Sequence, residues 1–288
     1  MRISEKWIDY ELIDASCGER LERWGNKILI RPDPQVIWKT EKQDVRWKCA
    51  DAHYYRSKSG GGKWEKSRNI EDSWKISYGD LYFKVELLGF KHTGLFPEQA
   101  VNWDLYSDII SKSEKTLNIL NLFAYTGGAT LACANAGAEV CHVDASKGMV
   151  ERAKENAFIS GLSKKPIRWI VDDCVKFVKR EIRRGNKYDG IIMDPPSFGR
   201  GNSGECWHLE DNIYDFIELC ASVLAEDAKF FLLNSYTTGL SPSVMEYMVR
   251  ELIQKKRMGT IISDEIGLEV TASGGKLPSG SSCLWILD

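Results

Sequence analysis

The segment with the most distinctive chemistry is MDPPSF at residues 193–198, which ends the apolar run GIIMD. Two consecutive prolines remove two backbone donors and fix φ, so they hold the Asp194 carboxylate and the Pro195 carbonyl rigidly. Acceptors placed in this way suit an amino group or the edge of a base. The plainer alternative is a strand that simply ends in a proline turn.

A second candidate is the turn NLFAYTGGAT at residues 121–130, which contains Gly127 and Gly128. Glycines let the backbone turn tightly and approach a ligand, and the helix that follows offers its N–H groups to an anion such as a carboxylate. This pattern suits a nucleotide-like cofactor, although a purely structural turn is an equal alternative. The third glycine of G-x-G-x-x-G and the Lys-Ser/Thr ending of a phosphate loop are missing, which argues against nicotinamide dinucleotides and ATP.

Acidic residues follow the next two apolar runs. Asp144 lies about 20 residues after the glycine turn begins, where a carboxylate accepts hydrogen bonds from ribose hydroxyls. Its alternative role is to cap the next helix, unless Ser146 does so. Of the pair Asp172 and Asp173, either is able to accept a hydrogen bond from an adenine amino group or to cap the helix that follows, and we favour Asp173 for adenine.

These residues need a framework, and the sequence from about residue 115 supplies one. Apolar runs alternate with longer stretches that have helical spacing, which is typical of βαβ units on a parallel sheet. Strands are expected at 116–123, 138–145, 166–173, 188–196 and 228–235, with helices at 129–137, 146–161, 174–185 and 213–227. The tail adds a helix and two more strands, so we predict a doubly wound α/β sheet of about seven strands within 101–288.

The first 100 residues differ, with Trp24, Trp38, Trp47, Trp64 and Trp74 spread among short alternating segments. We predict that residues 1–100 form a small β-rich domain. Three consecutive glycines at 60–62, among lysines and arginines, lie in a segment without periodicity, so we predict a mobile loop over 53–73 with its Gly-rich part at 57–63.

The composition indicates a globular protein of a reducing compartment. The 288 residues carry a net charge of -2, so no global positive field points to nucleic acid. No apolar run is long enough to span a membrane and the start has no signal-peptide pattern, so we expect a cytoplasmic protein. Eight scattered cysteines predict free thiols, and the four histidines show no metal-ligand spacing.

The ordered series NLFAYTGGAT, VDASKGMVERAKENA, VDDC and MDPPSF closely resembles the class I S-adenosylmethionine methyltransferases. Within them it resembles the family that includes the bacterial large-subunit ribosomal RNA methyltransferases. The likeness continues through FKHTGLFPEQAVNW and LPSGSS, so it covers roughly residues 80–288. It implies a Rossmann-like fold and the cofactor S-adenosylmethionine. Residues 18–38 resemble the small β domain that precedes the catalytic domain in some members.

The resemblance also implies roles. The backbone of residues 124–128 would contact the methionine moiety, Asp144 the ribose and Asp173 the adenine, while Asp194 would face the substrate and Thr93, Gly94 and Gln99 would close over the cofactor. Ala100 replaces an arginine that is frequent in the family, which puts any role of that arginine in doubt. The candidate cofactor-binding residues are Thr93, Gln99, Phe123, Ala124, Tyr125, Thr126, Gly127, Gly128, Asp144, Ala145, Ser146, Asp172, Asp173 and Asp194. The candidate catalytic residues are Asp194, Pro195, Pro196 and Phe198.

The residues also bear on which atom is methylated. Methylation at cytosine C5 needs a cysteine that adds to C6, and neither 194–197 nor 233–236 contains one, so nitrogen is favoured unless Cys206 reaches the site. Phe198 would stack on the target ring or else be an ordinary core aromatic.

The methyl acceptor stays open. Two features favour RNA: the basic loop with Tyr54, Tyr55, Trp64 and Trp74, and the basic helix at 176–187. The alternatives are that the tryptophans fill a β core and that the basic helix presents a solvated face. A small planar molecule, a protein side chain and a catalytically inactive binding module are the alternatives. The chain is a monomer or a homodimer, and no segment resembles an extra RNA-binding module.

Overall fold

The computed structural model describes residues 1–57, 61–89, 91–200, 206–237 and 239–288. It divides into two compact units, one of Met1–Ala100 with Gly267–Ser279 and one of Val101–Ile266 with Gly280–Asp288. The sequence boundaries assign residues 267–279 to the C-terminal domain, whereas the structure groups them with the N-terminal unit. They form the tip of a long hairpin, where Val270 pairs with Leu12 of an N-terminal strand.

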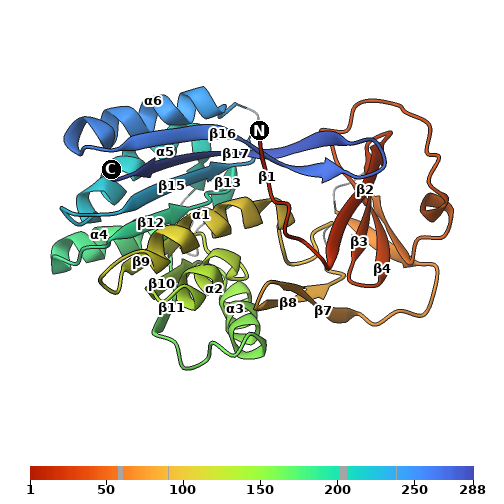
Figure 1. Ribbon diagram of the computed structural model, residues 1–288, viewed down its shortest axis with the longest axis horizontal. Coiled ribbons are helices and arrows are strands. Elements are labelled where there is room, and N and C mark those ends of the chain that lie inside the picture. Colours follow the sequence, from red (N-terminus) through yellow and green to blue (C-terminus); the bar gives the residue numbers. More distant parts are fainter. Residues whose placement is uncertain (58–60, 90, 201–205, 238) are drawn as a thin grey trace. The chain divides into compact units, whose positions relative to one another are not determined.

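The C-terminal unit is built on a mostly parallel sheet with helices on both faces, as predicted (Figure 1). Its strand order in the described part of the chain is β11-β10-β9-β12-β15-β17-β16, which makes seven strands. The strands are β9 (Asn118–Leu122), β10 (Glu139–Asp144), β11 (Ile167–Val171), β12 (Gly190–Met193), β15 (Phe230–Ser235), β16 (Thr260–Val270) and β17 (Gly275–Ile286). The first five are parallel and β17 is antiparallel to β15.

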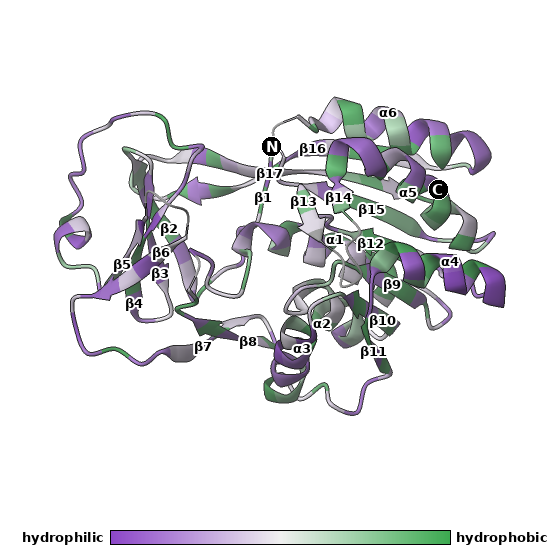
Figure 2. Cartoon of the chain, turned by 180° about the vertical axis from the view of Figure 1, so that it is seen from behind, coloured by the Kyte–Doolittle hydropathy of each residue, from purple (hydrophilic) through white to green (hydrophobic). Residues whose placement is uncertain are grey.

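Within the residues that the structure describes, six helices cover this sheet. They are α1 (Ala100–Ser111), α2 (Gly128–Asn135), α3 (Lys147–Ile159), α4 (Cys174–Arg184), α5 (Leu209–Val223) and α6 (Pro242–Leu252). Helices α4, α5 and α6 pack on one face in a single apolar cluster that includes Phe177, Phe216 and Met245, and α1, α2 and α3 lie on the other (Figure 1). The central strands are mostly hydrophobic (Figure 2), as expected for a parallel sheet buried on both faces.

The N-terminal unit is β-rich. It contains β1 (Arg2–Ile3), β2 (Tyr10–Ser16), β3 (Glu19–Trp24), β4 (Lys27–Pro32), β5 (Ala52–Arg56), β6 (Gly62–Lys66), β7 (Ser73–Tyr78) and β8 (Leu81–Glu86). Strands β2, β3 and β4 form an antiparallel meander, β4 pairs with β5 in parallel, and β7 and β8 form a separate hairpin. Among the described residues, short 3-10 turns lie at Val45–Lys48 and Pro97–Gln99 in this unit and at Gln254–Lys256 in the C-terminal unit.

The predicted mobile loop over 53–73 is wrong, because most of β5 (Ala52–Arg56) and all of β6 (Gly62–Lys66) lie within it. Gly62 begins β6, and β5 and β6 pair as an antiparallel hairpin in which Tyr54 lies opposite Trp64. Their rings meet edge to face at 5.4 Å, so this cross-strand aromatic pair ties the two strands together. Residues 58–60 lie outside the described residues.

The tryptophans of this unit mostly fill its core. Trp24 is fully buried and Trp47 is nearly so, while Trp64 and Trp74 are partly buried and donate their indole N–H groups to the carbonyls of Leu88 and Trp24. The core alternative given for Trp64 and Trp74 is therefore the one that the structure supports.

Within the described residues no helix is both long and apolar enough to cross a bilayer. The same residues contain no group of three or more histidine, cysteine or acidic side chains placed to hold a metal ion. The eight cysteines, each within the described part of the chain, form no disulfide bond, and five of them are buried.

A buried polar chain links the first two strands of the C-terminal unit to α2. Asn121 Nδ2 donates to Thr130 Oγ1 at 2.9 Å, and Thr130 Oγ1 lies 2.9 Å from Nδ1 of His142. Burial, reinforced by the charge of Lys154, lowers the pKa of His142 to about 3. The imidazole is therefore neutral in the folded protein at neutral pH, and the chain of hydrogen bonds holds α2 against β9 and β10.

This histidine gives the fold a pH dependence. Between its unfolded pKa of about 6.5 and its folded value, the unfolded chain binds the extra proton, so stability falls as the pH is lowered through that window. In urea titrations the free energy of unfolding of the wild type should fall when the pH is lowered from 7 to 5. In His142→Leu we expect this fall to be about 2 kcal/mol smaller. Thr130→Val, which breaks the same chain but keeps the imidazole, should lower stability at pH 7 and retain the wild-type slope. Equal slopes for His142→Leu and the wild type would contradict this account.

Candidate functional site

The candidate residues of the C-terminal unit gather at one edge of its sheet. Strands β9, β10, β11, β12 and β15 run in parallel, so their carboxyl ends meet there. The later strands lie on opposite sides of β9: β10 and β11 are on one side, and β12 and β15 are on the other. Open α/β sheets bind ligands at such a switch point.

The turn after β9 has an unusual backbone. Phe123 and Tyr125 have φ values of 55° and 50°, and Gly127 has 87°. A left-handed residue other than glycine costs roughly 1–2 kcal/mol, so other contacts must hold this conformation. The Tyr125 amide donates to Asp144 Oδ2 at 2.8 Å, and the Phe123 amide donates to Cys174 Sγ at 3.3 Å.

The two glycines of this turn are required by space. A Cβ on Gly127 would lie 2.9 Å from the Cβ of Ala153, and a Cβ on Gly128 would lie 2.6 Å from the ring of Trp103. Gly127 is the N-cap of α2 and has no side chain with which to cap it. The first amides of α2 are thus suited to a ligand carboxylate, such as that of a methionine moiety.

Asp144 keeps acceptor capacity beside the turn after β9, and its contact with a ribose stays a prediction. Its Oδ1 accepts from the Ser146 amide and its Oδ2 from the Tyr125 amide, each at 2.8 Å, and each carboxylate oxygen keeps a second lone pair. Burial raises the pKa of Asp144, against the effect of these two amides. Ser146 caps α3 by accepting from the Met149 amide, so helix capping is not the role of Asp144. Ala145 and Ser146 are exposed beside it.

The two acidic residues after β11 divide their tasks. Asp173 caps α4, with its Oδ1 accepting from the Lys176 amide at 2.8 Å, which is the alternative role given by the sequence. Asp172 accepts from the Asp173 amide and forms an ion pair with Arg180. Since Asp172 is neutralised in this way, Asp173 remains the better candidate for adenine, through its other oxygen, and this role stays a prediction.

The segment after β12 combines an anchored start with an exposed end. Asp194 is partly buried, Pro195 is buried and Pro196 is exposed. Phe198 is 49% exposed and meets the ring of His208 edge to face at 5.1 Å. The alternative that Phe198 is an ordinary core aromatic is therefore wrong, and its stacking on a target ring stays a prediction.

Sequence reasoning missed several residues at this edge. Asn102 of α1 donates to Asn234 Oδ1 at 3.1 Å, and Ser282 donates to Asn102 Oδ1 at 3.2 Å, which fixes α1 to the end of β15 and to the paired part of β17. Cys174, which accepts from the Phe123 amide, was treated only as one of several scattered thiols. A polar asparagine at the end of the apolar run FFLLN was the one signal that the sequence offered.

Thr93, Gly94 and Gln99 belong to the N-terminal unit. Thr93 and Gln99 are buried there, and Gly94 has a φ of 94°. The other candidate residues lie in the C-terminal unit, so a role for these three at the cofactor stays a prediction.

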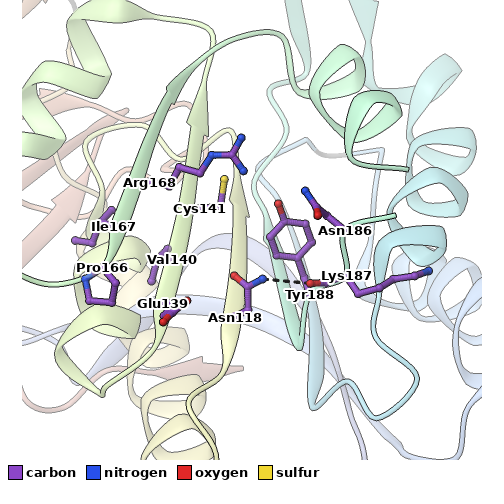
Figure 3. Close-up of a pocket in the computed structure, with 10 residues that line it drawn as sticks. All are labelled: Asn118, Glu139, Val140, Cys141, Pro166, Ile167, Arg168, Asn186, Lys187 and Tyr188. Atoms are coloured by element: carbon purple, nitrogen blue, oxygen red, sulfur yellow. Dashed lines mark hydrogen bonds between the residues drawn. The ribbon is translucent and has the colours of Figure 1, made fainter. Parts of the chain in front are cut away.

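A separate cavity of about 420 Å³ opens at the opposite edge of the sheet (Figure 3). It is lined by the first residues of β9, β10 and β11 and by the segment before β12, including Asn118, Cys141, Arg168 and Tyr188. None of the candidate site residues lines it. The Tyr188 hydroxyl donates to the buried Glu181 at 2.7 Å, which ties this segment to α4.

This combination of a doubly wound sheet, a glycine turn before α2 and acidic residues after β10 and β11 is that of a cofactor-binding methyltransferase domain. The family model of S-adenosylmethionine-dependent methyltransferases matches residues 39–211, and the chain belongs to this family. Its cofactor is therefore S-adenosylmethionine, and the glycine cradle, the uncapped α2 and Asp144 described above fit that molecule.

Two curated proteins and one solved structure illustrate what this chain is similar to. The chain is 32% identical to ribosomal RNA large subunit methyltransferase K/L of Shewanella frigidimarina over 260 residues, covering 80% of this chain and 35% of that protein. It is 26% identical to the enzyme of the same name from Colwellia psychrerythraea over 214 residues, covering 74% and 27%. The chain thus spans about a third of the length of these curated relatives. A crystal structure of a SAM-dependent methyltransferase from Agrobacterium tumefaciens matches with a TM-score of 0.94 and 36% identity, covering 99% of this chain and 93% of that one.

Proposed function

We propose that this chain transfers the methyl group of S-adenosylmethionine to a nitrogen of an RNA base, with ribosomal RNA as the substrate class, in the cytoplasm. One observation carries the proposal: the Asp194 acceptor and the half-exposed Phe198 flank the two prolines at the carboxyl ends of the parallel strands. The turn after β9, here called the cofactor turn, lies at the same edge of the sheet. The curated relatives support RNA, because they are named as ribosomal RNA methyltransferases. We also propose that residues 1–100 and 101–288 correspond to a small β-rich domain and the cofactor-binding domain.

The chain's own residues would act mainly by alignment. The cofactor, when bound, supplies an electrophilic methyl group on a sulfonium. The Asp194 carboxylate and the Pro195 carbonyl accept hydrogen bonds from the target amine, so that its lone pair points toward the cofactor turn. Phe198 stacks on the base. In-line transfer needs orientation and a dry site more than strong acid or base catalysis.

A second candidate, methylation at cytosine C5, rests on one contact. Cys206 on the short strand β14 (Cys206–His208) is exposed, and its Sγ lies 3.4 Å from Nε2 of His208. Such a pair resembles a thiol with an adjacent base. Under the nitrogen proposal Cys206→Ala keeps wild-type activity, measured as labelled methyl incorporated into RNA. Loss of all activity in Cys206→Ala would favour C5 chemistry.

The test of the proposed function is transfer of radiolabelled methyl from S-adenosylmethionine to RNA, protein and small-molecule extract of a strain that lacks the gene, followed by nucleoside mass spectrometry. We expect label in RNA, on a base nitrogen. Label confined to protein or small molecules would overturn the RNA assignment. An inactive binding module would transfer no label. S-adenosylmethionine would still raise its melting temperature, because a ligand that binds only the native state stabilises it.

A further inference from the structure

The two prolines of the Asp194–Pro196 segment create a structural problem. Neither ring nitrogen has an N–H, so the segment offers carbonyls but cannot be tied down by its own donors at these two positions. Pro196 is exposed, and its carbonyl would otherwise be left to water. A donor from elsewhere in the chain is needed to fix this part of the segment.

Trp207 supplies that donor. Its indole N–H donates to the Pro196 carbonyl at 2.7 Å. The residue reaches this position because β13 (Phe198–Arg200) and β14 (Cys206–His208) form an antiparallel ribbon in which Trp207 lies opposite Gly199. The Leu209 amide, which donates to the Ser197 carbonyl at 3.0 Å, closes the ribbon where it joins α5.

The same indole ring contacts the cofactor turn. Its centroid lies 5.5 Å from that of Phe123, the first residue of the turn, and 5.6 Å from that of Phe216. Phe123 and Phe216 in turn meet edge to face at 5.8 Å. Phe216 is only 1% exposed within α5, so the three rings form a cluster with a fixed base.

From these contacts we infer that Trp207 is a positioning residue, which holds the acceptor segment at Asp194–Pro196 in register with the cofactor turn at Phe123. The inference rests on the proposed function for its catalytic meaning. Trp207 itself touches neither methyl donor nor acceptor in this account. It sets the distance between the residues that do, and an error of about 1 Å in such a distance costs on the order of 100-fold in rate.

The test is Trp207→Phe, which keeps an aromatic ring but removes the N–H. We expect kcat for RNA methylation to fall between about 10-fold and about 100-fold, with the dissociation constant of S-adenosylmethionine and the KM for RNA each within about threefold of the wild type. Trp207→His, which keeps a ring N–H, should recover part of the loss. The matched control is Trp38→Phe in the N-terminal unit, where the lost N–H donates to the Ala15 carbonyl at 2.6 Å, and it should leave kcat unchanged.

A second measurement does not depend on activity. Amide exchange in residues 194–199, followed by mass spectrometry, should become about fivefold faster in Trp207→Phe, the factor expected for one lost hydrogen bond. Unchanged exchange together with unchanged kcat would overturn the inference. So would a loss of activity that is matched by a lower melting temperature and is equal in the Phe and His variants, because Trp207 would then serve folding alone. If the wild type methylates no RNA, the proposed function fails, and the exchange result still decides whether Trp207 holds the segment.

Discussion

Asp194→Ala is expected to lower methyl transfer to RNA by about 100-fold or more while leaving the affinity for S-adenosylmethionine within about threefold of the wild type. A hydrogen bond to a charged acceptor contributes on the order of 1.5–3 kcal/mol, and here the acceptor also orients the lone pair that attacks. The two prolines leave no neighbouring side chain able to replace the carboxylate. Single-turnover rates with labelled cofactor and calorimetric titration of the cofactor measure the two quantities separately.

The control for this variant is Asp215→Ala, which removes an exposed carboxylate from α5 and should leave the rate unchanged. An Asp194→Ala protein that binds the cofactor normally and turns over at the wild-type rate would remove Asp194 from the mechanism. A variant that loses cofactor affinity and rate in equal measure would move Asp194 from the acceptor to the cofactor.

Gly127→Ala is expected to weaken the binding of S-adenosylmethionine at least about 10-fold and to destabilise the protein by about 2 kcal/mol or more. Alanine at a φ of 87° costs roughly 1–2 kcal/mol, and its Cβ would lie 2.9 Å from the Cβ of Ala153 in α3. Relief of that contact requires movement of the turn that bears the first amides of α2. Cofactor titration and urea unfolding are the measurements.

Gly137→Ala provides the comparison at the other end of the same helix. Gly137 has a φ of 104°, but a Cβ there would meet nothing within 4 Å. We expect it to show the cost of the backbone strain alone, with cofactor affinity unchanged. Equal cofactor affinities in the two variants would mean that the turn tolerates displacement and that the glycine serves only the fold.

The parallel sheet was predictable because its strands are mostly apolar. Residues 228–235, for example, were expected to be a strand, and β15 spans Phe230–Ser235 with every residue buried. Such runs carry their own signal, since both faces of the sheet are covered. The β5–β6 hairpin was missed because its signal is weak: β6 contains one partly buried tryptophan between lysines, and its pairing depends on Tyr54 across the ribbon.

The site was predictable where a residue stands at a strand end, and not where its role depends on a distant partner. Asp144 and Asp194 could be chosen from their positions after apolar runs. Cys174 receives the amide of a residue 51 positions earlier, and Trp207 donates to a carbonyl 11 positions earlier across a ribbon. Neither spacing has a pattern in the sequence, so the geometry had to supply these partners.

The grouping of Gly267–Ser279 with the first hundred residues has a practical consequence for dissecting the protein. The Thr271 and Ala272 amides donate to the carbonyls of Leu12 and Ile13, so the hairpin tip completes the edge of the β2 strand. A fragment cut after residue 100 would leave that edge bare and open to aggregation. To express or exchange the β-rich part alone, the segment Gly267–Ser279 should be joined to residues 1–100. Otherwise the two units should be expressed together as one chain.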